Sequence, residues 1–170
     1  MGRMENARLL GGIGAVLTLA GAGFLGFILK LLAVKEIAVE TGREEILKEY
    51  IWAAVLWIAS SLILTGVLIE YWLNPPATPR TALETIGVIT FLAALLMIVG
   101  SWFLKESYTA IANETGVKTF DTAGKLYFFG GILSLILLGF VLILVAAILE
   151  VLAFLKLPEE IKKERGLVGA

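Results

Sequence analysis

The sequence predicts an all-α, polytopic membrane protein with four transmembrane helices, built as two tandem helical hairpins that run in the same direction. Three observations support this fold class. Hydrophobic residues make up 59% of the chain and charged residues 17%, and the mean hydropathy of +0.92 exceeds that of soluble domains. Four long uncharged runs follow one another. The phrase Ile-Ala-Val-Glu-Thr-Gly at 37–42 returns, with one difference, at 111–116, each time between two apolar runs.

The residue types that are missing exclude much chemistry. The chain has no Cys and no His, so disulfides, thiolate nucleophiles and imidazole ligands cannot form. The remaining carboxylate, Lys, Tyr and hydroxyl groups form no recognisable metal site or pair of nucleophile and base, so we expect no enzyme and no cofactor. A net charge of -1 offers no basic field for nucleic acid. The lack of Cys and Gln, with few Met and Asn, is typical of a thermophile.

The first predicted span is the uncharged run 9–29, which is longer than the apolar part of a signal peptide and is kept as an uncleaved helix. Small residues recur along it at every fourth position, namely Gly14, Thr18, Ala22 and Gly26. Such a ridge lets a neighbouring backbone come close. We expect this helix-packing ridge to face another helix of the same bundle, with a dimer seam as the alternative.

Each copy of the repeated phrase ends in a glycine that can close a helix. The first helix continues without a breaker beyond the membrane surface up to Gly42, and Gly116 holds the same place in the second copy. Glycine readily takes the left-handed conformation that a C-terminal cap needs. Gly42 and Gly116 are therefore predicted helix-cap turns, which explains the repeat without a binding site. Tyr50 and Tyr127 also correspond, if the second copy carries three additional residues.

The other spans follow in order. The second span is 51–69, flanked by aromatic residues typical of a membrane interface. Three prolines then forbid a helix and make 74–82 the joint between two units. The third span runs over about 85–104, and the fourth, 126–149, continues through 151–157 until Pro158 stops it. We predict a single membrane domain, 1–170, with unit one at 9–73, unit two at 83–157 and a charged tail at 158–170.

Four spans would place both termini on one side of the membrane and the two Glu-Thr-Gly turns on the other. The pseudo-symmetry axis of the two units would then lie along the membrane normal. Seven Lys and Arg residues fall on each side, so the positive-inside rule does not decide the orientation. The cluster Lys162, Lys163 and Arg165 favours cytoplasmic termini for a multi-pass protein of the cell membrane.

Two carboxylates near the ends of equivalent spans, Glu70 and Glu150, are the candidate functional acids. Ionisable residues within spans are costly and often functional. Glu150 is the harder one to solvate, because 24 uncharged residues precede it. Water at the headgroup level, Arg8 or Arg80, or a proton or bound cation could relieve this cost. Glu70 and Glu150 could also share a partner across the pseudo-axis.

The other charged groups are expected to be solvated. Lys30 and Lys105 should extend to the membrane surface opposite Glu150. The acidic residues around the first turn lack the ligand spacing of a calcium loop and form a solvated face: Glu36, Glu40, Glu44, Glu45 and Glu49. The glycosylation sequon at 113–115 is explained by the turn itself.

The 111–116 phrase, the glycine-rich span after it and the sequence Ala-Phe-Leu-Lys-Leu-Pro at 153–158 together resemble a small archaeal membrane family, the domain-of-unknown-function family numbered 996. The similarity extends from Glu5 to Pro158. The resemblance implies a four-helix integral membrane protein, and it implies no activity, substrate or catalytic residue.

Two functional classes remain. Small-residue ridges and the lack of reactive side chains favour a non-catalytic scaffold or interaction protein, whose partners would be the lipid bilayer, further copies of the chain or another membrane protein. The parallel duplication instead favours a small transporter or channel with a site between the two units. A polar cavity between the units would favour transport, and a packed interface would favour the scaffold.

Overall fold

The computed structural model describes residues 2–75, 78–134 and 138–161. The regular elements in these residues are all helices: α1 (Arg3–Leu19), α2 (Gly23–Thr41), α3 (Glu44–Leu73), α4 (Pro79–Thr115), α5 (Thr119–Leu133) and α6 (Leu138–Leu155). The predicted all-α class is confirmed, but the predicted number of spans is wrong. Three helices of the described residues are long and apolar enough to cross a membrane, namely α3, α4 over Ile86–Thr115, and α6.

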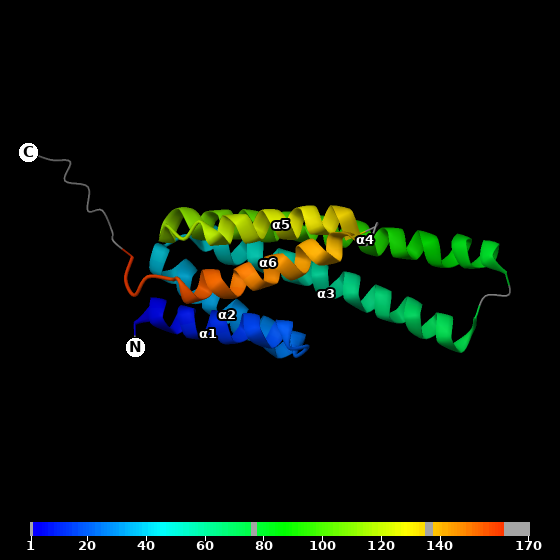
Figure 1. Cartoon of the computed structure of the whole chain (residues 1–170), viewed down its shortest axis with the longest axis horizontal. Coiled ribbons are helices and arrows are strands. Elements are labelled where there is room, and N and C mark those ends of the chain that lie inside the picture. The colour runs from blue at the N-terminus through cyan, green and yellow to red at the C-terminus, as the bar shows by residue number, and fades with distance from the viewer. Residues whose placement is uncertain (1, 76–77, 135–137, 162–170) are drawn as a thin grey trace, which may run out of the picture.

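The two long helices, α3 and α4, run antiparallel along the whole molecule, and the four shorter helices cover one half of it (Figure 1). α1 and α2 form one antiparallel hairpin, and α5 and α6 form another. The N-terminus, the turn from α2 to α3, the turn from α4 to α5 and the end of α6 all lie at the same end of the bundle. The connection from α3 to α4 lies at the opposite end.

The predicted first span, residues 9–29, is not one helix, because the chain reverses at its centre. Gly21 takes a left-handed conformation with φ of +89°. The Gly21 N–H donates to the Thr18 carbonyl at 3.3 Å, and the Ala22 N–H donates to the Leu17 carbonyl at 2.9 Å. These two bonds close the end of α1 in the manner of a Schellman motif and turn the chain back into α2. The run of apolar residues therefore forms a hairpin with its tip at Gly21.

The predicted fourth span, residues 126–157, is likewise divided. α5 ends at Leu133, α6 begins at Leu138, and the two helices pack against each other as a second hairpin. The two reversals change the predicted topology. The N-terminus, the end of α6 and both Glu-Thr-Gly turns lie at one end of the bundle (Figure 1), whereas four unbroken spans would put the turns on the side opposite the other two.

Glycines allow the helices of each hairpin to come into contact. A Cβ on Gly14 would lie 2.6 Å from the carbonyl oxygen of Gly26, and a Cβ on Gly130 would lie 3.0 Å from that of Gly139. A Cβ on Gly14 would force the backbone to shift, and a Cβ on Gly130 would be closer to that carbonyl than nearly all real Cβ contacts are. Gly14, Thr18 and Gly26 of the predicted ridge thus pack α1 on α2 within the chain, while Ala22 lies in the turn as the N-cap of α2.

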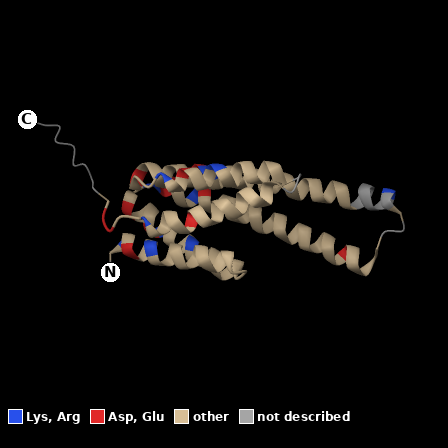
Figure 2. Cartoon of the chain, in the orientation of Figure 1, with Lys and Arg blue, Asp and Glu red and all other residues tan. Residues whose placement is uncertain are grey.

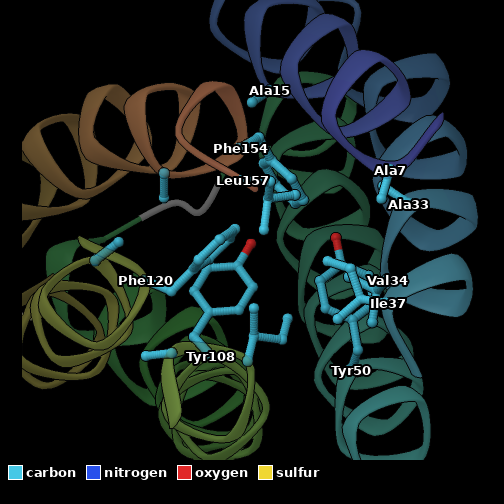
Figure 3. Close-up of a cluster of buried hydrophobic side chains, with 14 of the residues drawn as sticks. Ala7, Ala15, Ala33, Val34, Ile37, Tyr50, Tyr108, Phe120, Phe154 and Leu157 are labelled. Atoms are coloured by element: carbon cyan, nitrogen blue, oxygen red, sulfur yellow. The ribbon is translucent and has the colours of Figure 1, made fainter. Parts of the chain in front are cut away.

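The core lies where the two hairpins meet α3 and α4 (Figure 3). Ile37 of α2, Ile46 of α3, Tyr108 of α4, Phe120 of α5 and Phe154 of α6 are all fully buried. Phe120 meets Phe154 edge-on with 5.0 Å between ring centroids, and Tyr108 meets Phe120 at 5.4 Å. Each such pair adds roughly 0.5–1.5 kcal/mol to the effect of area burial. The core therefore joins both hairpins to the long helices.

Candidate functional site

The buried carboxylate of Glu150 is the centre of the site. Glu150 belongs to α6 and is 1% exposed. The Tyr108 hydroxyl donates to Oε1, and the Tyr127 hydroxyl donates to Oε2 at 2.7 Å. The Lys30 ammonium lies 3.1 Å from Oε1 and 3.3 Å from Oε2. Each carboxylate oxygen thus accepts a hydrogen bond from one tyrosine, and the Lys30 ammonium lies close to both oxygens, which is the compensation that a buried charge requires.

The cluster of Lys30, Tyr108, Tyr127 and Glu150 forms because each member occupies a core position of a different helix. Lys30 lies on the buried face of α2, where Val34 and Ile37 follow it at helical spacing. Glu150 lies on the buried face of α6 among small residues, which leave space for the lysine stem and the tyrosine rings: Ala146, Ala147 and Ala153. The polar cluster is therefore set into an otherwise apolar seam.

Aromatic rings from α3 and its neighbours enclose the cluster. Tyr50 stacks on Tyr108 with 6.3 Å between ring centroids, and Phe27 stacks on Tyr50 at 5.9 Å. Trp57 meets Tyr127 edge-on at 5.7 Å. Figure 3 shows the hydroxyl groups of Tyr50 and Tyr108 directed toward the middle of the bundle. The ion pair is thus held in a packed, low-dielectric setting, where charges interact strongly.

The cluster connects the two hairpins. Lys30 comes from the α1–α2 hairpin, and Glu150 comes from the α5–α6 hairpin. The exposed fraction is 10% for the Lys30 side chain and 1% for that of Glu150. Removing one partner of such a pair costs roughly 3–5 kcal/mol, because the other charge stays buried without compensation. Chemically, the arrangement can hold the hairpins in register and can pass a proton between a carboxylate, an ammonium and two phenols.

The partner of Glu150 is not one that the sequence suggested. Arg8 lies 3.9 Å from Glu159 instead. Lys30 does not extend to the opposite surface but is buried beside Glu150, while Lys105 pairs with Glu106 at 2.9 Å near the surface. Lys30 lies in the apolar face of α2, and this position is the sequence signal that points to Lys30 as the partner of Glu150.

Glu70, the second candidate acid, lies apart from this site. It is exposed, and it accepts a hydrogen bond from the Asn74 side-chain amide at 2.9 Å. About 30 Å of helix separate it from Tyr50, whose ring packs beside the cluster. Glu70 and Glu150 therefore do not share a partner. Tyr108 and Tyr127 are hydrogen-bond partners of Glu150 that the sequence pattern does not predict, although it predicts that Tyr127 corresponds to Tyr50.

The two Glu-Thr-Gly turns have the same local structure. Gly42 and Gly116 follow the ends of α2 and α4 with φ of +70° and +74°. The hydroxyl of Thr41 donates to the carbonyl four residues earlier at 2.9 Å, and that of Thr115 does the same at 2.7 Å. Each threonine oxygen also accepts the backbone N–H two residues later at 3.3 Å. The phrase thus encodes a helix end, and the superposition of the two whole units stays a prediction.

The acidic residues near these turns are at the surface. Glu36 lies 3.7 Å from Arg3, and Glu114 of the second turn lies 3.4 Å from Arg43 beside the first. The described residues contain no group of three or more acidic side chains that could hold a metal ion.

One family model and one curated protein match the chain. The family model described as "Protein of unknown function (DUF996)" matches residues 22–148. The chain belongs to this family. The uncharacterized protein MJ1644 of Methanocaldococcus jannaschii is 36% identical over 171 residues, covering 95% of this chain and 97% of that protein. No solved structure matches. The family model covers Lys30, Tyr108 and Tyr127 of this DUF996 protein and ends just before Glu150.

Proposed function

We propose that this DUF996 protein is a non-catalytic membrane scaffold, which acts by associating with copies of itself or with another membrane protein. The observation that carries the proposal is the filled centre of the bundle. The space between the hairpins and the long helices is occupied by aromatic rings and by a polar cluster whose charges are compensated internally. A rigid, packed centre suits a structural role.

In this proposal, α3 and α4 cross the membrane completely, whereas α6, although long and apolar enough to cross, folds back on α5 as one half of a hairpin. With 30 and 37 residues α3 and α4 are about 45 Å and 55 Å long, against a hydrocarbon thickness of about 30 Å. The two hairpins enter from the end with the termini and reverse inside the bilayer. The uncharged part of α1, residues 9–19, is about 16 Å long, which is close to half of that thickness. The bonds that cap α1 at Gly21 reduce the number of unpaired backbone groups at this depth.

The distribution of charge supports an orientation for the protein. Figure 2 shows Lys and Arg gathered at the end with the N-terminus, whereas Arg80 marks the start of α4 at the opposite end. Under the positive-inside rule, this distribution favours a cytoplasmic side for the N-terminus and for both Glu-Thr-Gly turns. With four straight spans, seven Lys and Arg residues would lie on each side of the membrane. The two hairpin reversals bring most of these residues to the same end of the bundle, so the count is no longer equal.

The exposed part of the α3–α4 pair is the surface proposed for association. Beyond the hairpins, Leu62, Leu68, Trp72 and Leu73 are between 61% and 84% exposed. Affinity purification from native membranes, after cross-linking, tests the scaffold. We expect a homo-oligomer or a second membrane protein to be captured, and Leu62→Trp with Leu68→Trp to reduce the yield. A cross-linked sample that stays monomeric and captures no protein would contradict the proposal.

A second function, a small transporter, is favoured by one observation. Lys30 lies in unit one, whereas Glu150 and both tyrosines lie in unit two, so an ionisable cluster occupies the boundary between the units. Ionisable groups inside membrane proteins often move protons or ions. Proton flux into liposomes distinguishes the two functions. If the protein is a scaffold, the proton flux should equal the leak of liposomes without protein. If it is a transporter, the flux should exceed that leak, and Glu150→Gln should abolish the excess.

A further inference from the structure

The two halves of the bundle differ in cross-section. At the end with the N-terminus, all six helices of the described residues lie together, whereas only α3 and α4 continue to the opposite end (Figure 1). The second hairpin can be followed along α4 as far as Ile98, because a Cβ on Gly131, close to the end of α5, would lie 3.7 Å from the Ile98 Cα. Tyr127 of the same helix meets Trp57 of α3 edge-on. The second hairpin therefore ends near the level of Trp57 and Ile98.

The first hairpin ends at the same level. Phe27 of α2 stacks on Tyr50 of α3 with 5.9 Å between ring centroids. α2 begins at Gly23, about 6 Å of helix from Phe27 toward the hairpin tip, and Trp57 lies about 10 Å of helix from Tyr50 in the same direction. The turn at Gly21 extends the tip to about the depth of Trp57. Both hairpins thus cover α3 and α4 over one half of the bundle and stop at one depth.

In the far half, α3 and α4 have only each other as neighbours among the described residues (Figure 1). The Ser60 hydroxyl donates to the Ala93 carbonyl at 2.8 Å and joins the two helices there. Leu62 and Leu68 of α3 are 68% and 61% exposed. The uncovered part of α3, residues 58–73, is about 24 Å long, which exceeds half of the hydrocarbon thickness of about 30 Å. Acyl chains of one leaflet therefore surround two helices, whereas those of the other leaflet surround six.

We propose that the protein acts as a wedge that prefers and stabilises curved membrane, with the hairpin half in the convex leaflet. A helix with its side chains is about 10 Å wide, so the four helices of the two hairpins add about 300 Å² of cross-section to one leaflet and none to the other. The leaflet with the larger inserted area lies on the outside of a bend, because bending relieves the difference in area between the leaflets. Bilayers adapt to the shape of an embedded protein at modest cost, and helices inserted in a single leaflet bind according to curvature.

This inference rests on the proposed membrane embedding, in which both hairpins reverse within the bilayer. It goes beyond the scaffold because it concerns the shape of a single copy and needs no partner protein. The preferred surface is a lipid bilayer that bends away from the end with the two Glu-Thr-Gly turns.

Sorting between a giant vesicle and a narrow membrane tube pulled outward from it tests the wedge. The full-length protein is reconstituted in both orientations at a density too low for copies to meet. Two single-cysteine variants at exposed positions, Lys118→Cys and Asn74→Cys, are labelled from outside with a membrane-impermeant maleimide dye. The Lys118→Cys dye marks copies with the hairpin half in the outer leaflet. The Asn74→Cys dye marks copies with this half in the inner leaflet, so each variant is the matched control for the other.

We expect the Lys118→Cys dye to be enriched in the tube relative to a lipid dye, and the Asn74→Cys dye to be depleted. Their tube-to-vesicle ratios should differ by at least about twofold, a free-energy difference of about 0.4 kcal/mol. Equal ratios, or enrichment of the Asn74→Cys dye, would overturn the proposal. A difference that disappears when the protein-to-lipid ratio is lowered would also overturn it, because assembly and not the shape of one copy would then cause the sorting. Equal ratios would leave the scaffold intact, since capture of a partner by cross-linking tests that function separately.

Discussion

Loss of either partner of the Lys30–Glu150 ion pair should destabilise the protein far more than loss of the pair as a whole. At 3.1 Å and an effective dielectric constant of 20, the attraction between the two charges is about 5 kcal/mol. Taking both charges out of water costs several kcal/mol for each ion, which offsets most of that attraction. The pair as a whole should therefore contribute little, whereas a single remaining charge keeps its cost without its partner.

We expect Lys30→Met or Glu150→Met to lower the free energy of unfolding by about 3–5 kcal/mol. Replacing both residues by Met should lower the free energy of unfolding by much less than the sum of the two single effects, because no charge remains buried. Unfolding by denaturing detergent in mixed micelles measures all four proteins of this cycle.

Lys125→Met provides the matched control for the cycle. Its exposed pair with Asp121, at 2.6 Å, should contribute only about 0.3–0.5 kcal/mol. Native stability of Lys30→Met would show that the pair is not a buried, compensated one. A double variant whose stability loss equals the sum of the two single losses would show that the two charges do not interact.

Two further predictions concern packing and pH. Gly26→Leu should cost at least about 1–3 kcal/mol of stability, because the new side chain meets the Gly14 carbonyl, whereas Ala22→Leu in the turn should cost less; equal losses in thermal unfolding would disprove this. The Lys125 ammonium donates a hydrogen bond to Asp121 and lowers the pKa of that carboxyl. Its stabilising effect is present above the unfolded pKa and is lost as the pH falls through the folded pKa, so Asp121→Asn should be less stable than the native protein at pH 7 and equally stable near the acid limit of folding.

The helical class and the turn chemistry could be predicted from the sequence, because both depend on local patterns. Long apolar runs specify helices in lipid, and the glycine at the end of each repeated phrase specifies a left-handed residue. The reversal at Gly21 could not be predicted in the same way. An uncharged run of this length fits both a straight span and a hairpin, and the contact between Gly14 and Gly26 that favours the hairpin exists only after folding.

The same difference between local patterns and contacts made on folding explains how much of the candidate site the sequence predicts. Glu150 could be identified from its own surroundings, since it interrupts a long apolar run. Its partner depends on topology. A straight first helix carries Lys30 to the membrane surface opposite Glu150, and only the reversal at Gly21 returns it to the same end of the bundle. The prediction of a straight helix through Gly21 therefore led to the wrong position for Lys30 and so to the wrong partner for Glu150.

Cysteine accessibility tests the proposed topology most directly, because the native chain has no cysteine that would interfere. Single variants Arg3→Cys, Lys118→Cys and Asn74→Cys place one thiol at the N-terminus, the second turn and the α3–α4 connection, at positions that are all exposed. A membrane-impermeant maleimide is added to intact cells and to inverted vesicles. With the hairpins reversing in the membrane, Arg3→Cys and Lys118→Cys should be labelled only in inverted vesicles and Asn74→Cys only in intact cells. Labelling of Arg3→Cys and Asn74→Cys from one side, with Lys118→Cys from the other, would indicate four straight spans and would rule out the hairpin topology.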